Sequence, residues 1–143
     1  MKRIKISPNF YLDEYIPKDL YLKYIDTKPH YLTWLIDNRL IEADQKLRDI
    51  FGPITINNWI SGGSRNWSAL RTPDSPYYKS KSQHSFGRAS DKIFKNATAD
   101  EVREYIKEHW KDLQITAIEN NVSWVHSDFR YIPNQKELMI FNS

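Results

Sequence analysis

Three potential metal ligands, far apart along the chain, constrain the fold more than any other feature of this sequence. His84 and Asp91 lie in one segment, residues 82–91. His126 lies 35 residues beyond Asp91, in a second segment, residues 124–128. Two imidazoles and one carboxylate suit a zinc ion that keeps one coordination position for water. If the three residues bind one ion, the chain must fold so that these two segments meet.

A second interpretation is also open, in which His84 and His126 are ordinary polar residues at strand ends. The chain has 4 histidines and no cysteine, so a metal can take only nitrogen and oxygen ligands, and no disulfide can form. His30 and His109 lie in no comparable pattern, and His109 falls on a predicted helix as a surface residue. Residue spacing alone leaves both interpretations open.

The spacing of the ligands predicts the local structure around them. His84 and Asp91 are seven residues apart, and a straight strand would place them on opposite faces because seven is odd. A turn must therefore intervene, and Gly87 supplies the backbone freedom for one. We expect His84 on a loop, Asp91 at the start of a strand, and His126 in a neighbouring strand.

Hydrophobic periodicity predicts an α+β fold with two main helices and a small, mainly antiparallel sheet. Apolar residues at three- and four-residue steps predict a helix over 30–50, which Gly52 and Pro53 end. Thr98 and Glu101 form a capping box that begins a second helix, running to about residue 112. The remaining predictions are a short helix near 12–15, an irregular loop over 58–83, and strands over 54–56, 91–94, 122–128 and 136–141.

Length and charge limit the classes of protein that this chain can represent. Its 143 residues suit a single domain over 1–143, with 40% hydrophobic residues to build a core. The net charge is +3, and the sequence contains no run of five basic residues. The absence of such a run argues against a nucleic-acid partner. No apolar stretch is long enough to span a membrane, and the basic start lacks the apolar region of a secretory signal peptide.

Four segments of the chain resemble segments of one protein family, and they occur in the same order along the sequence as in that family. The pattern Ser-x-His-x-x-Gly-x-Ala-x-Asp over 82–91 resembles the signature of the zinc D-Ala-D-Ala carboxypeptidases and phage peptidoglycan endopeptidases, which have the hedgehog/DD-peptidase fold. Residues 124–128 are similar to that family's second signature, an apolar strand that ends in the third zinc ligand. Residues 7–15 and 68–73 resemble the entry segment and the arginine segment of its short, phage-type branch.

The resemblance implies zinc ligation by His84, Asp91 and His126. It also implies that Arg71 holds a substrate carbonyl or carboxylate and stabilises the developing oxyanion. Arg65 is an alternative for that role because the motif does not fix the loop length, and either arginine could instead be a solvated loop cation. Ser82 and Gln83 are expected to hold the motif loop or a substrate backbone.

The chain departs from the family pattern at the general base. Many members carry an acid three residues before the last zinc histidine, where this chain has Ser123. Asp128 shares a strand face with His126 and is one candidate base, although it could equally orient a ligand. Glu119 is the other candidate. We expect it in the loop before the strand, where it would either reach the site or end a solvated helix.

The resemblance implies a zinc metallopeptidase that hydrolyses peptide bonds in bacterial peptidoglycan stems or cross-bridges. Zn²⁺ is the expected cofactor, a peptidoglycan peptide is the expected partner, and the chain is expected to be a monomer unless it is assembled in a virion. The missing export signal fits a phage endolysin that stays in the host cytoplasm until holin-mediated release, or a virion component. The alternative is a non-catalytic virion or cell-wall-binding domain. Ser123 favours that alternative, and the complete ligand set argues against it.

Overall fold

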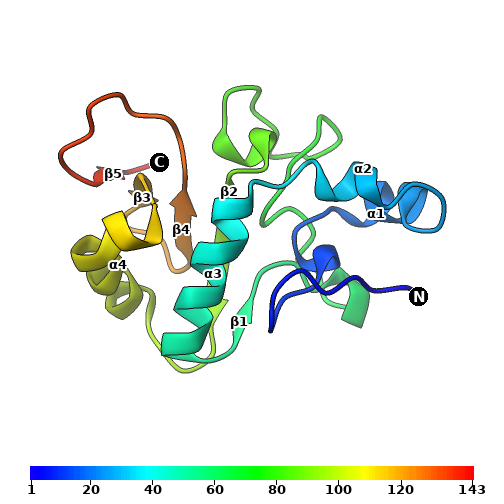
Figure 1. Ribbon diagram of the computed structural model, residues 1–143, viewed down its shortest axis with the longest axis horizontal. Coiled ribbons are helices and arrows are strands. Elements are labelled where there is room, and N and C mark those ends of the chain that lie inside the picture. The colour runs from blue at the N-terminus through cyan, green and yellow to red at the C-terminus, as the bar shows by residue number, and fades with distance from the viewer.

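The computed structural model describes residues 1–143, arranged as helices around a five-stranded sheet (Figure 1). The two longest helices are α3 (Asn38–Phe51), which packs on strand β2, and α4 (Ala99–Leu113), which packs on β4. Two shorter helices, α1 (Lys18–Tyr24) and α2 (His30–Thr33), lie on the other side of α3 from α4 (Figure 1). The α+β class predicted from the sequence is confirmed.

The sheet has the strand order β1-β2-β4-β3-β5. Its strands are β1 (Ile54–Thr55), β2 (Ala89–Phe94), β3 (Ala117–Glu119), β4 (Val125–Asp128) and β5 (Met139–Phe141). Three pairings are antiparallel, but β5 pairs with β3 in parallel, so the sheet is mixed rather than antiparallel throughout. The chain re-enters the sheet at the end where β4 finished, because Asp128 and Met139 both pair with Ala117. Strand β5 therefore runs opposite to β4 and parallel to β3.

The helix boundaries follow local capping interactions. The predicted capping box is confirmed, since Thr98 Oγ1 accepts a hydrogen bond from Glu101 N at 3.1 Å at the start of α4. The single helix predicted over 30–50 is wrong, because the chain breaks between α2 and α3. Asp37 caps α3 by accepting from Arg39 N, and its own N–H donates to Gly87 O. The apolar stripe continues through this break, so periodicity could not reveal it.

Strands β2 and β4 have two faces with different surroundings. On the helix face, Phe94 and Val125 join the hydrophobic core with residues of α3 and α4, such as Leu47 and Ile106. On the opposite face, which we call the site face, the pairing Asp91↔His126 places a carboxylate beside an imidazole. Because side chains alternate along a strand, each strand contributes to both faces.

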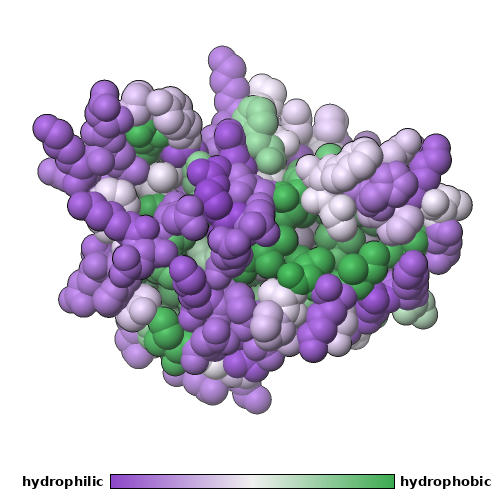
Figure 2. All heavy atoms as spheres, in the orientation of Figure 1, coloured by the Kyte–Doolittle hydropathy of each residue, from purple (hydrophilic) through white to green (hydrophobic).

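The molecular surface on the α3 side is mostly hydrophilic over α3 itself (Figure 2). A band of hydrophobic residues lies between α3 and the part of the chain that forms α1 and α2 (Figure 2). None of the helices combines the length and the apolar character needed to cross a bilayer.

Candidate metal centre

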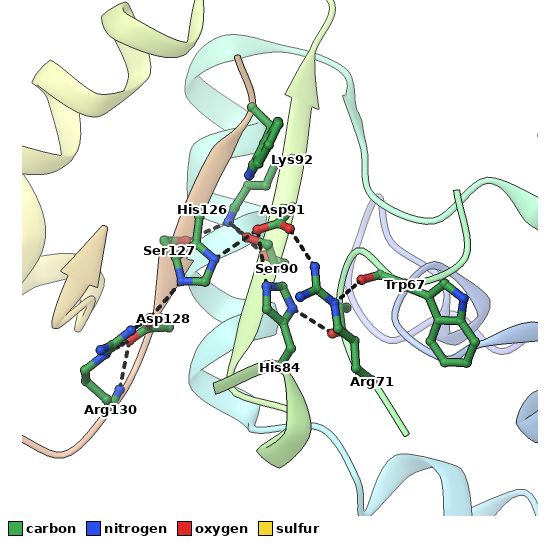
Figure 3. Close-up of polar contacts among 12 residues, drawn as sticks. Trp67, Arg71, His84, Ser90, Asp91, Lys92, His126, Ser127, Asp128 and Arg130 are labelled. Carbon is green, nitrogen blue, oxygen red and sulfur yellow. Dashed lines mark hydrogen bonds and ion pairs between the residues drawn. The ribbon is translucent and has the colours of Figure 1, made fainter. Parts of the chain in front are cut away.

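The fold brings His84, Asp91 and His126 together, as the sequence predicted. His84 lies on the short 3-10 helix η3 (Gln83–Phe86), and the other two residues lie on the adjacent strands β2 and β4 (Figure 3). One potential ligand atom from each residue falls within 4.8 Å of the others. Two segments that are distant in sequence therefore form one site, at the position expected for a metal.

Gly87 makes the turn between η3 and β2. Its φ of 67° is left-handed, and a Cβ at this position would collide with the backbone of Leu35. Only glycine meets both requirements at no cost. Asp91 is the third residue of β2 rather than its first, because the strand begins two residues earlier than predicted, at Ala89.

Each imidazole is oriented by a partner outside the site. His84 Nδ1 lies 2.8 Å from Ala69 O, which can only accept, so this nitrogen carries the proton. His84 Nε2 then faces Asp91 Oδ1 at 3.3 Å. His126 is arranged the other way round: Nε2 lies 2.8 Å from Asp128 Oδ2, and Nδ1 lies 2.9 Å from Asp91 Oδ1. This arrangement of partners is typical of metal-binding histidines.

The arrangement fits a small cation. Burial lowers the pKa of His84, so the ring is neutral at pH 7 and Nε2 directs a lone pair at the carboxylate oxygen of Asp91. Two electron-rich atoms at this separation repel unless a cation lies between them. Tetrahedral zinc with bonds of about 2.0–2.1 Å would hold neighbouring ligand atoms roughly 3.3 Å apart. The His84 pair already has that separation, and the His126 pair needs to widen by about 0.4 Å.

Charges around the site determine how the other groups titrate. Burial is the largest single influence on Asp91 and opposes its ionisation, but the hydrogen bonds and charges of His126 and His84 together outweigh burial and hold the Asp91 pKa far below its usual range. Burial also opposes a charged His126, yet its bonds to Asp128 and Asp91 raise the His126 pKa. A metal at His126 Nδ1 therefore competes with a proton, so metal affinity should weaken as the pH falls.

Of the two predicted arginines, only Arg71 directs its side chain to a metal-ligand carboxylate. Arg71 Nη2 donates to Asp91 Oδ2 at 3.1 Å, and Nε donates to Trp67 O at 2.8 Å (Figure 3). Arg65 instead donates to two backbone carbonyls, those of Ile56 and Asp91. Arg65 thus braces the chain near β1 and β2, whereas Arg71 lies where a substrate could meet it.

Ser82 and Gln83 hold the motif loop through their backbones. Ser82 O accepts from Ser85 N, and Gln83 O accepts from Arg88 N. Neither side chain contacts the metal-binding residues, and the buried Oε1 of Gln83 has no hydrogen-bond partner. The structure therefore supports a role in shaping the loop, and a substrate role for either residue stays a prediction.

Asp128 is fully occupied by other groups. Its side chain has no exposed surface, and it bonds both His126 Nε2 and the guanidinium of Arg130, with Nη2 at 2.6 Å and Nε at 2.9 Å. The bonds from Arg130 and His126 outweigh burial and lower the Asp128 pKa. Asp128 therefore orients His126 from the side away from Asp91. Arg130, which the sequence analysis missed, could have been found from its i+2 spacing to Asp128.

Glu119 lies in strand β3, and the prediction that placed it in a loop is wrong. The register Ala117↔Asp128 and Ile118↔Ser127, continued by one residue, sets Glu119 beside His126 on the site face. The rings of His126 and Phe141 approach to 5.5 Å, and Phe141 pairs with Glu119. Glu119 is buried, and its carboxylate forms no hydrogen bond or ion pair within the chain. Of the carboxylates that Asp91, Asp128 and Glu119 place on the site face, only that of Glu119 has no hydrogen-bond or ion-pair partner.

Two cavities of the molecule lie apart from the centre. A cavity of about 280 Å³ lies between α3 and α4, and one of about 200 Å³ lies between η1 (Leu12–Glu14) and β1. Neither includes a residue of the centre. Comparison with known proteins gives no relative: no family model, curated protein or solved structure matches the chain.

Proposed function

We propose that this protein is a zinc-dependent peptidase that hydrolyses peptide bonds in bacterial peptidoglycan stems or cross-bridges. The observation that carries the proposal is the convergence of His84 Nε2 and His126 Nδ1 on one oxygen of Asp91. Three protein ligands leave a coordination position free, which is typical of catalytic rather than structural zinc. Bound there, zinc would supply Lewis-acid polarisation of the scissile carbonyl and acidify a water.

Arg71 is the residue best placed to hold the substrate. Its guanidinium is fixed by Trp67 O and Asp91 Oδ2, and its side chain keeps 18% of its surface exposed. A guanidinium has five N–H donors, and these two contacts use only two of them. The remaining donors can bind a substrate carboxylate or the oxyanion that develops on the carbonyl oxygen.

Glu119 is the best candidate to accept the proton of the attacking water. It lies beside His126 in the sheet and has no partner that would compete for its carboxylate. Asp128 cannot accept a proton without giving up its bonds to Arg130 and His126. We therefore assign the base role to Glu119 and the orienting role to Asp128, which reverses the preference that strand spacing alone suggests.

The substrate class rests on the resemblance of residues 82–91 and 124–128 to peptidoglycan peptidase signatures. A phage origin, as an endolysin or a virion component, is part of the same proposal. The direct test is hydrolysis of purified stem peptides and cross-linked fragments, followed by mass spectrometry, with and without a chelator. Zinc-dependent cleavage is the expected result. A zinc-loaded chain that is inert on every fragment would favour the non-catalytic, wall-binding alternative instead.

The two arginines give a matched pair of variants. We expect Arg71→Ala to keep zinc and fold but to lose about 10²–10³-fold in kcat, because an oxyanion contact is missing. Arg65→Ala should reduce the free energy of unfolding instead, since Arg65 bonds two backbone carbonyls. Measuring kcat and thermal stability of both variants separates the roles. The reverse pattern would place the substrate at Arg65.

A further inference from the structure

A buried ion pair lies directly behind the candidate metal centre, on the helix face of β2 and β4. Lys92 of β2 and Asp44 of α3 have no exposed side-chain surface. Lys92 Nζ lies 3.1 Å from Asp44 Oδ1, a contact without hydrogen-bond alignment. Its protons go instead to Ser127 Oγ at 2.6 Å, Ser90 Oγ at 2.7 Å and Ser90 O at 3.2 Å (Figure 3).

Asp44 completes the cluster from the helix side. Its Oδ2 accepts hydrogen bonds from the hydroxyls of Tyr15 and Ser90, each at 2.9 Å. Burial and the charge of Asp44 raise the Tyr15 pKa well above its usual value, so the phenol stays a donor. We call Tyr15, Asp44, Ser90, Lys92 and Ser127 the buried hub. All five residues are fully buried, so the hub is closed to solvent.

The hub touches both strands that carry metal ligands. Ser90 and Lys92 are the two chain neighbours of Asp91, and Ser127 follows His126. Ser90 and Ser127 are direct cross-strand partners, as are Asp91 and His126. The bonds of Lys92 to both serines therefore clamp β2 to β4 beside the two ligands.

The hub also reaches the third ligand. Tyr15 O accepts a hydrogen bond from Leu70 N at 3.1 Å. Leu70 follows Ala69, whose carbonyl oxygen fixes His84 Nδ1. One buried cluster thus contacts the local structure around all three potential ligands, from the side that no substrate can reach.

Stability alone does not explain this arrangement. Replacing a buried ion pair by apolar side chains of similar volume is often neutral or stabilising. A gain in folding stability is therefore a poor explanation for the presence of this pair. We propose that Lys92 and Asp44 are positioning residues that hold β2, β4 and the Ala69 loop at the separations that the metal requires. This inference rests on the proposed metal centre and deepens it, because it names what fixes the ligand geometry.

The test is a double variant, Asp44→Asn with Lys92→Met, which removes both charges and keeps an acceptor for Tyr15 and Ser90. Arg3→Met with Asp13→Asn is the matched control, since Asp13 is equally buried and its pair contacts no ligand strand. We expect the hub variant to bind zinc about 10–100-fold more weakly, as when partners of metal ligands are lost. Its cobalt(II)-substituted form should show a shifted absorption spectrum, and the control should change in neither respect.

The outcomes separate this inference from the proposed function. If the wild type binds zinc and the folded hub variant has the same zinc Kd and cobalt spectrum, the positioning role is overturned while the metal centre stands. If the wild type binds no zinc, both are overturned. Should the double variant fail to fold, Ser127→Ala removes one bond of the clamp without an unpaired charge. An unchanged cobalt spectrum in Ser127→Ala would then also overturn the inference.

Discussion

The two faces of strands β2 and β4 both carry charged groups, but they differ in how those groups are paired within the protein. On the helix face, Lys92 donates three hydrogen bonds to serine oxygens and forms an ion pair with Asp44, so both charges have a countercharge within the protein, although Asp44 Oδ1 accepts no hydrogen bond. On the site face, two imidazole nitrogens converge on a single oxygen of Asp91. The charges on the helix face are balanced within the protein. On the site face, His84 Nε2 directs a lone pair at a carboxylate oxygen, and a bound cation would relieve that repulsion.

This difference assigns different tasks to alternate residues of the same strands. A closed polar network resists rearrangement, because each group that it frees would be left buried and unpaired. The lone pair of His84 Nε2, which faces a carboxylate oxygen of Asp91, is stabilised when a cation binds between the two atoms. The comparison indicates that residues on the helix face fix the separation of the strands, and that residues on the site face would bind the metal. Two experiments test this division, and a third concerns a buried carboxyl group that belongs to neither face.

The largest expected effect is on catalysis, from the site face. Glu119→Gln should reduce kcat/KM by about 10²–10⁴-fold while zinc content stays at the wild-type level, because a general base is lost without a metal ligand. Asp128→Asn should instead weaken zinc binding by about 10–100-fold. Peptide hydrolysis assays and metal analysis of both variants distinguish the roles. An active Glu119→Gln beside an inactive, zinc-loaded Asp128→Asn would return the base to Asp128.

The next effect is on stability, from the helix face. Lys92→Met alone leaves Asp44 as a buried charge without its cation and should cost about 3–5 kcal/mol of the free energy of unfolding. Arg71→Met on the site face should cost less, because Arg71 keeps contact with solvent. Urea unfolding of the metal-free variants provides the measurement. Equal losses would show that the helix face is no more closed than the site face.

The smallest effect concerns Glu14, a carboxyl group with neither a metal site nor a lysine beside it. Burial raises the Glu14 pKa to about 7, and the carboxylate accepts a hydrogen bond from the N–H of Tyr11. Because the folded pKa lies above the ordinary value, the fold favours protonated Glu14, and that contribution is lost as the pH rises from about 4.5 through 7. Glu14→Gln should therefore be more stable than wild type by about 1–2 kcal/mol at pH 8.

The two proteins should have nearly equal stability at about pH 3, well below the ordinary pKa of 4.5, where Glu14 is protonated in both the folded and the unfolded wild type. Thermal unfolding at both pH values tests this prediction. A difference that is larger at the acidic pH than at pH 8 would have the wrong sign and would contradict a raised pKa.

The sequence predicted the site better than it predicted the sheet. The ligands and the turn at Gly87 were predictable because their spacing and residue types carry the chemistry. Strand β3 was missed because Ala117–Glu119 is only three residues long and is defined by its neighbours. That omission also misplaced Glu119, since its position beside His126 depends on the strand pairing.

The buried hub was not predictable for a similar reason. Strand alternation places Lys92 on the face opposite Asp91, but lysine is rarely buried, and its partner Asp44 lies on a helix 48 residues earlier. Likewise, the break at Asp37 depends on a hydrogen bond to Gly87, a contact that exists only in the folded chain. Pairings of this kind become visible only in three dimensions.

The most direct test of the account is the zinc content of the purified protein and of two histidine variants. The wild type should hold about one zinc per chain. His84→Ala should lose the zinc, because two protein ligands hold the ion too weakly after one of three is removed. His109→Ala is the matched control, since His109 is a half-exposed residue of α4 outside the candidate centre and its replacement should leave the zinc content unchanged. Equal zinc in the wild type and in His84→Ala, or none in the wild type after loading, would contradict the account.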